Sequence, residues 1–180
     1  MPSTFRSATC SDLLLIQDLA HRIWHECYPG IITTAQIDYM LERRYAPGQL
    51  ELDLQGGIRM DLAHWEGEAV GFSGYGPAER DGEMKLHKLY VLASQRRHGI
   101  GRALLTRALE WGLQEGFESL CLLVNKRNVN AIAAYQRYGM EVREAVVTEI
   151  GRGFVMDDYI MAAPIRVLLR TSGTVSAGSE

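Results

Sequence analysis

The sequence predicts a single domain of mixed α/β (α+β) type, in which helices pack on both faces of one sheet. The hydrophobic spacing changes along the chain, from a helical period over most of residues 12–55 to strand-like alternation from residue 58. An almost unbroken apolar run at 119–124 suits a strand buried on both faces. At 180 residues, 47% of them hydrophobic, the chain can bury one core, and no repeat or interdomain linker interrupts it.

The first third of the chain predicts one strand followed by helices. The expected elements are a strand at 5–9, a helix at 12–27, a second helix beginning near 34 and a helical turn at 49–55. Ser11-Asp12 is suited to capping the first helix, and Tyr28-Pro29-Gly30 is suited to ending it. Pro47-Gly48 interrupts the second helix.

The rest of the chain predicts strands with two further helices between them. The expected elements are hairpin strands at 58–65 and 68–75, a strand at 83–92, a helix at 101–115, a strand at 119–124, a helix at 128–138, and final strands at 141–149 and 154–161. Glu66-Gly67 supplies the first hairpin turn, and Gly139 is suited to ending the later helix. The domain is expected to span 1–165, with 166–180 as a flexible C-terminal tail.

Charge and cysteine content exclude several classes of protein. A net charge of −3 argues against general nucleic-acid binding, and no apolar stretch approaches the roughly 18 residues that a membrane helix needs. The three cysteines are an odd number in no metal-ligand spacing, which predicts reduced thiols, a cytoplasmic location and no metal centre. However, six Lys or Arg residues and no Asp or Glu lie between Lys85 and Arg107, which indicates a specific anionic ligand.

The clearest functional signal is a glycine-containing loop between a buried strand and a helix, with the pattern Arg96-x-x-Gly99-x-Gly101. Glycines there let the backbone approach a ligand closely. The first amides of a helix lack partners within it and point outward at the positive end of the helix dipole. This geometry binds a pyrophosphate, to which Arg96, Arg97 and Arg102 can donate charge-assisted hydrogen bonds.

Two other phosphate-binding arrangements fit this loop less well. A dinucleotide-binding fold places its glycine loop after the first strand, with an acidic residue about 20 residues later at a strand end. Here the loop follows a later strand, and the segment at the corresponding place, Glu115 to Glu118, lies at a helix end and not at a strand end. A P-loop needs Gly-Lys-Ser/Thr, which the sequence lacks.

Two motifs in order resemble those of the GCN5-related N-acetyltransferases (GNAT family). Residues 96–101 are similar to the family's pyrophosphate loop, Gln/Arg-x-x-Gly-x-Gly/Ala. Residues 128–140 are similar to its Asn-x-x-Ala-x-x-x-Tyr-x-x-x-Gly-Phe motif, with Met140 in place of Phe, and 153–161 resembles the last strand of many members. The resemblance covers residues 5–161. It implies the GNAT fold, a mostly antiparallel mixed sheet of six to seven strands with a splay between the two central strands.

The resemblance also implies that acetyl-CoA is the cosubstrate. The implied contacts come from the strand before the loop, the loop with the start of its helix, and the later helix: Leu89, Tyr90, Val91, Gln95, Arg96, Arg97, His98, Gly99, Ile100, Gly101, Arg102, Asn128, Ala131 and Tyr135. The strand residues would act through their backbone, so their side chains can also serve the core. Asn128 equally suits a helix cap on local grounds.

Two residues are candidates for proton transfer. Tyr135 occupies the position of the family's usual proton donor to the departing CoA thiolate, although an aromatic residue on an apolar helix stripe also suits the core. His87 stands two residues before Leu89, where relatives often carry Glu. A histidine there can accept a proton from an amine near neutral pH, or it is a strand histidine held by its neighbours.

The predicted reaction is direct transfer of an acetyl group, within a ternary complex, to a primary amine of a small molecule or a peptide. The small molecule would be polyamine-like or amino-acid-like. By resemblance, the acceptor contacts come from Glu26, Tyr28, Asp157 and Asp158, and two copies are expected to form a homodimer. Two alternatives stay open: a non-catalytic acyl-CoA-binding sensor or subunit, and a transferase of another acyl group.

Overall fold

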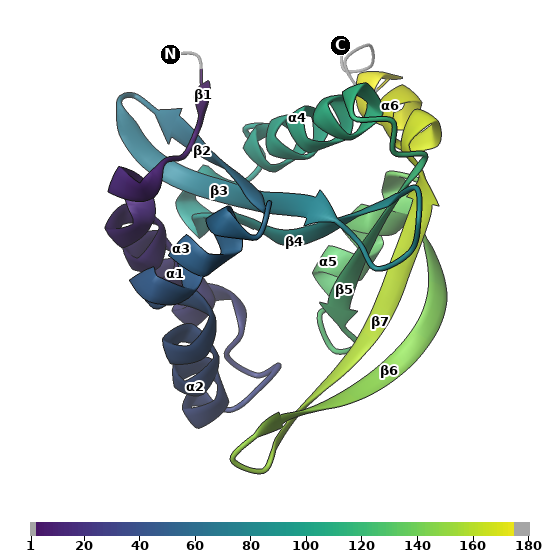
Figure 1. Cartoon of the computed structure of the whole chain (residues 1–180). Coiled ribbons are helices and arrows are strands. Elements are labelled where there is room, and N and C mark those ends of the chain that lie inside the picture. The colour runs from purple at the N-terminus through teal and green to yellow at the C-terminus, as the bar shows by residue number, and fades with distance from the viewer. Residues whose placement is uncertain (1–2, 175–180) are drawn as a thin grey trace. The chain divides into compact units, whose positions relative to one another are not determined.

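The computed structural model of the chain describes residues 3–174, in which it contains seven β-strands, six α-helices and two short 3-10 helices. The strands are β1 (Thr4–Ser7), β2 (Arg59–Trp65), β3 (Glu68–Pro77), β4 (Glu83–Val91), β5 (Ser119–Asn125), β6 (Glu141–Gly151) and β7 (Phe154–Pro164) (Figure 1). The chain divides into two compact units. The first comprises the chain up to Gly76 with His87–Leu105, and the second comprises Pro77–Leu86 with the chain from Thr106 onward.

The sheet is mixed, with strand order β1-β2-β3-β4-β5-β7-β6. The pairings β1–β2, β2–β3, β5–β7 and β6–β7 are antiparallel. β4 and β5 are parallel, with Glu83 opposite Ser119 and Leu86 opposite Leu122. The predicted fold class, a mostly antiparallel mixed sheet with helices, is therefore confirmed, and the splay between the central strands stays a prediction.

The first unit contains three helices that form for local reasons. They are α1 (Leu13–Cys27), α2 (Thr34–Tyr45) and α3 (Pro47–Gln55). Apolar residues recur every three or four positions along α1, so that Leu19 and Ile23 are fully buried. Thr33 caps α2 by accepting a hydrogen bond from the backbone N–H of Gln36, at 3.2 Å. Pro47 opens α3, at a position where the helix needs no N–H.

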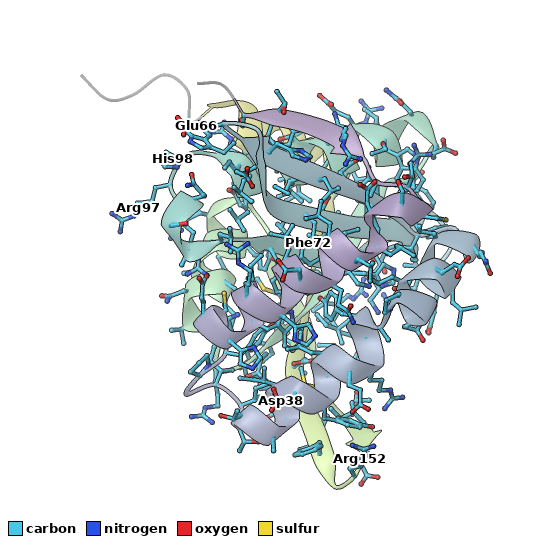
Figure 2. All side chains as sticks on the ribbon, turned by 90° about the vertical axis from the view of Figure 1, so that its left-hand side faces the viewer. Asp38, Glu66, Phe72, Arg97, His98 and Arg152 are labelled. Atoms are coloured by element: carbon cyan, nitrogen blue, oxygen red, sulfur yellow. The ribbon has the colours of Figure 1, made fainter. Side chains whose placement is uncertain are left out.

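Aromatic side chains hold these helices against strands β3 and β4. The ring of Trp24 lies 5.7 Å from that of Tyr45 and 5.9 Å from that of Tyr90, between centroids. Phe72, labelled among the side chains in Figure 2, lies 6.0 Å from Tyr45 and 5.6 Å from Tyr90. Such pairs add about 0.5–1.5 kcal/mol each beyond the burial of their area. They fix the helices to the half of β4 that leads into the glycine-containing loop.

The hairpin of β2 and β3 has the predicted turn. Glu66 and Gly67 both have positive φ, 53° and 88°, which matches the twist of two antiparallel strands joined by two residues. The register shifts between Ala63 and His64, where β3 carries one extra residue. Such a bulge bends the strand and increases its twist, and it lies just before the tip of the hairpin.

The second unit buries one face of β4, β5 and β7. It contains most of α4 (Ile100–Gln114), together with α5 (Val129–Arg137) and α6 (Ile165–Thr174). Met84, Leu120 and Met161 are fully buried, one from each of the three strands. A Cβ on Gly112 would overlap the sulfur of Met84, so this glycine lets α4 lie directly against the start of β4.

The chain is helical beyond the predicted domain boundary. Residues 166–180 were expected to form a flexible tail, but α6 continues from Ile165 to Thr174, and the prediction is wrong for that segment. Ile165 and Leu168 lie one helical turn apart and are fully buried, which explains why the helix packs. The predicted tail at 175–180 lies outside the described residues. The extent of the domain, 1–165, stays a prediction.

No helix within residues 3–174 combines the length and the apolar character that spanning a membrane requires.

Candidate active site

The loop between β4 and α4 has the backbone geometry of an anion site. Arg97 and Gly99 have positive φ, 71° and 75°, so the chain turns sharply before α4 begins. The carbonyl of Gly99 accepts from the N–H of Ala103 at 2.9 Å, which makes Gly99 the first residue to bond into the helix. The N–H groups of the next residues therefore have no partner within α4 and lie at the positive end of its dipole.

The side chains of the loop add positive charge to these amides. Arg96 and Arg97 are exposed, and Arg102, in the first turn of α4, is half-buried. Gly101, also in the first turn, is half-buried, and a Cβ there would make an ordinary contact with a methyl group of Val91 at 3.7 Å. Free amides, a glycine and arginines on one short segment fit a pyrophosphate chemically.

The end of α1 is bonded to the segment just before the loop. A carboxylate oxygen of Glu26 accepts from the backbone N–H of Ala93 at 3.0 Å, and Ala93 opens the 3-10 helix Ala93–Gln95. The guanidinium of Arg96 donates to the sulfur of Cys27 at 2.6 Å. Burial raises the pKa of the Cys27 thiol and outweighs the opposing effect of Arg96, so Cys27 stays protonated at neutral pH. Glu26 was predicted as an acceptor contact, yet in the structure its carboxylate bonds to the backbone of Ala93, just before the loop.

We expect Glu26→Ala to weaken acetyl-CoA binding about fivefold to tenfold, because the N–H of Ala93 loses its anchor and the loop loses part of its support. The acceptor KM should stay unchanged. Titration calorimetry with acetyl-CoA and steady-state kinetics with the acceptor check the two halves of this expectation. Glu26→Gln, which keeps an accepting oxygen, is the matched control and should recover most of the affinity. A raised acceptor KM with normal acetyl-CoA binding would return Glu26 to the acceptor site.

Tyr28 and Tyr90 meet through their hydroxyl groups. The two oxygens lie 3.2 Å apart, and the ring of Tyr28 lies 4.4 Å from that of Trp24 between centroids. Tyr28 is buried and Tyr90 is half-buried. The structure therefore brings a predicted acceptor residue against a predicted CoA-binding residue. Leu89 and Val91 are half-buried beside Tyr90, and His87 is exposed earlier on the same strand.

Three residues that shape this part of the first unit were not singled out from the sequence. A Cβ at Gly71 would lie 2.7 Å from the carbonyl oxygen of Tyr90, so only glycine lets β3 approach β4 there. Lys88, whose side chain is 8% exposed, pairs with Asp53 of α3 at 2.8 Å and anchors the same stretch of β4. Trp65 stacks on His98 of the loop. The sequence does show Gly71 and Lys88 as unusual residues within apolar strands, and this signal could have drawn attention to them. It does not show which residues they contact.

The second unit places the other family motif on α5. Asn128 caps this helix, its side-chain oxygen accepting from the N–H of Ala131 at 3.3 Å. Tyr135 is half-buried one turn further on. Burial, with a smaller effect from Tyr138, raises the pKa of Tyr135 to about 12, so its phenol keeps its proton at neutral pH. Met140, which stands where the family motif has Phe, is buried, and its backbone N–H donates to the carbonyl of Tyr135 at 3.0 Å.

The two acids predicted as acceptor contacts in β7 do not share one environment. Asp157 is exposed and pairs with Lys126, whose ammonium lies 5.5 Å from the centre of the Tyr159 ring. Asp158 is buried and stands opposite Asn125 of β5. Alternation along the strand directs the two side chains to opposite faces of the sheet. Within the described residues 3–174, no three His, Cys, Asp or Glu side chains gather into a group that could hold a metal ion.

Comparison with known proteins gives a consistent result. Residues 18–140 match the acetyltransferase (GNAT) family. The uncharacterized N-acetyltransferase YuaI of Bacillus subtilis is 32% identical over 142 residues, which span 77% of this chain and 80% of YuaI. The structure is similar to that of the PaiA N-acetyltransferase from Thermoplasma acidophilum in complex with coenzyme A, with a TM-score of 0.77 and 22% identity over 91% of this chain and 99% of that one.

A similar fold occurs in the ribosomal-protein-S18-alanine N-acetyltransferase of Escherichia coli, with a TM-score of 0.69 and 20% identity over 91% of this chain and 94% of that one. At such identities the structural likeness shows the fold alone. The matched segment, however, includes both the loop before α4 and the Asn–Tyr motif of α5, and it extends over more than half of the chain. With sequence, motifs and fold in agreement, the chain belongs to the GNAT family of acetyltransferases.

Proposed function

We propose that the protein is an acetyl-CoA-dependent N-acetyltransferase that acetylates a primary amine of a small molecule or a peptide. The observation that carries this proposal is the loop before α4, where free amides, the left-handed Gly99 and arginines form a site suited to a pyrophosphate. The PaiA N-acetyltransferase, which has a similar fold, is known in complex with coenzyme A. Membership of the GNAT family supports the same cosubstrate.

The proposed contacts to acetyl-CoA lie on β4, in the loop that follows it and at the start of α5. In the first unit, the backbone of Leu89–Val91 is proposed to bind the pantetheine arm, and Gln95–Arg102 the pyrophosphate. In the second unit, Asn128 and Ala131 at the start of α5 are proposed to contact the pantetheine arm. Tyr28, Asp157 and Asp158 are the proposed acceptor contacts, and Glu26 contributes through the loop. A homodimer and a cytoplasmic location stay predictions.

The proposed reaction is a direct transfer. The neutral amine attacks the carbonyl carbon of the thioester, a C–N bond forms and the C–S bond breaks. Backbone amides of β4 polarise the carbonyl oxygen as negative charge develops on it. His87 takes the proton that the amine must lose, and Tyr135 gives a proton to the departing thiolate. A lysine-like amine has a pKa near 10.4, so about 4.6 kcal/mol separates its charged and neutral forms at pH 7.

His87→Ala should lower kcat/KM for the amine by about tenfold to a hundredfold near neutral pH, because no imidazole then takes the proton. The loss should shrink as the pH rises toward the acceptor's own pKa, since the free amine needs no base. The measurement is kcat/KM from about pH 6 to 10. His21→Ala, an exposed histidine of α1 in the same unit, is the control. Full activity of His87→Ala over the whole range would exclude His87 as the base.

The proposal itself is tested by thiol release from acetyl-CoA against polyamines, amino acids, aminoglycosides and peptides. Release that depends on one class of amine would establish the enzyme and identify its acceptor. Competition with longer acyl-CoA esters would show whether another acyl group is preferred. If the protein binds CoA but no amine elicits release, it is an acyl-CoA sensor or subunit and the proposed activity is wrong.

A further inference from the structure

The side chain of Trp65, at the end of β2, packs face to face with the side chain of His98 in the loop. The ring centroids are 4.7 Å apart and the planes differ by 16°. Trp65 is half-buried, and His98 is exposed on its other side. In Figure 2, the side chain of Arg97 points away from the ribbon. The stack with Trp65 thus holds the loop at His98.

The hairpin tip that carries Trp65 is well defined. Trp65 stands opposite Glu68 across the tight turn, and the bulge between Ala63 and His64 lies immediately before it. Bulges next to functional sites commonly redirect a side chain. The tip therefore supplies a fixed surface on which a loop residue can rest, although the two residues are far apart in the sequence.

We propose that Trp65 is a positioning residue for acetyl-CoA binding, which acts by holding His98 and thereby the backbone amides of the loop. The inference rests on the proposed function of the loop. Arg97 and Gly99, on either side of His98, have left-handed φ values of 71° and 75°. An unsupported loop would spend little time in this conformation and would lose freedom when it bound a ligand. A loop that is already ordered by the stack avoids that loss, so its affinity for the ligand is higher.

Stacking differs in its consequences from a direct contact between His98 and a phosphate. If His98 acts through Trp65, removing either ring has the same effect, and removing both adds nothing further. If the imidazole contacts a phosphate itself, the effects of the two substitutions add. A direct contact also makes the affinity of the wild-type protein fall more steeply with salt than that of His98→Ala.

The test is titration of the wild-type protein and its variants with acetyl-CoA. Trp65→Ala should raise Kd about threefold to tenfold, and Trp65→Phe, which keeps an aromatic face, should stay within about twofold of the wild type. His98→Ala and the double variant should match Trp65→Ala. In Trp65→Ala and Trp65→Phe, kcat at saturating acetyl-CoA should be unchanged. Glu68→Ala, across the same turn, is the control and should bind normally.

The rate of trypsin cleavage after Arg97, measured without ligand, is a second measure of how well the loop is ordered. Trp65→Ala and His98→Ala should both be cleaved faster than the wild type, because a loop without its stack opens more often. Should Trp65→Ala fail to fold, His98→Ala carries the test, since its side chain is exposed. Normal affinity and normal cleavage in His98→Ala, or additive losses in the double variant, would overturn the inference. Failure of the wild-type protein to bind acetyl-CoA would instead refute the proposed function.

Discussion

We expect Tyr135→Phe to lower kcat for acetyl transfer by roughly a hundredfold, at the lower end of what general acid catalysis contributes. The raised pKa, about 12, keeps the phenol protonated but also makes it a weak acid. A CoA thiolate, with a thiol pKa near 8.5, is already a fair leaving group, so the proton is a modest help. The Kd for acetyl-CoA should not change, because only the departing thiolate needs the hydroxyl. Pre-steady-state and steady-state kinetics with calorimetric binding separate these quantities.

The pH dependence of the wild-type enzyme provides a further check on Tyr135. Because its pKa is raised to about 12, this phenol stays protonated through the working range and adds no alkaline limb to kcat up to about pH 10. Tyr138→Phe is the matched control, since Tyr138 is a half-buried tyrosine at the end of the same helix. It should retain kcat within about twofold. Full turnover in Tyr135→Phe would remove Tyr135 from the mechanism.

Gly99→Val should raise the Kd for acetyl-CoA at least about tenfold. Valine, branched at Cβ, is a strong outlier at φ +75°, and the left-handed conformation costs an L-residue about 1–2 kcal/mol. No atom lies within 4 Å of a Cβ built on Gly99, so the cost of the valine is backbone strain and not a clash, and this strain favours another conformation of the loop. The amides then no longer converge on a phosphate. Calorimetric titration with CoA and with acetyl-CoA measures the loss.

Gly116→Val is the matched control for Gly99. Gly116 has φ +88°, and a Cβ there would also meet no atom within 4 Å, but it lies in the turn after α4 and outside the loop. This variant carries the same backbone strain and should bind acetyl-CoA normally. If both variants bind like the wild type, the loop geometry is not what holds the ligand. If both lose binding, the effect is a general loss of stability, which denaturant unfolding would reveal.

Most helices and strands could be located from the chain alone because their signals are local. Apolar spacing located α1, and the Glu66-Gly67 pair identified the turn of the β2–β3 hairpin. The two GNAT motifs were readable for the same reason, since each lies within about a dozen consecutive residues. The helix α6 was missed because the mostly small and polar residues from Thr171 onward outweighed the apolar pair, Ile165 and Leu168, that buries it.

The arrangement around the candidate site depends on partners that are distant in the sequence. Glu26 is ambiguous at the end of a helix until its carboxylate is seen against Ala93, and Trp65 is an ordinary hairpin aromatic until it stacks on His98. Asp157 and Asp158 are neighbours in the sequence, but the pleat of the strand directs their side chains to opposite faces of the sheet, one exposed and one buried. Hydrophobic periodicity and turn preferences depend on a few consecutive residues, so they can be recognised in the sequence. Side-chain pairing acts through space, so it exists only after the chain has folded.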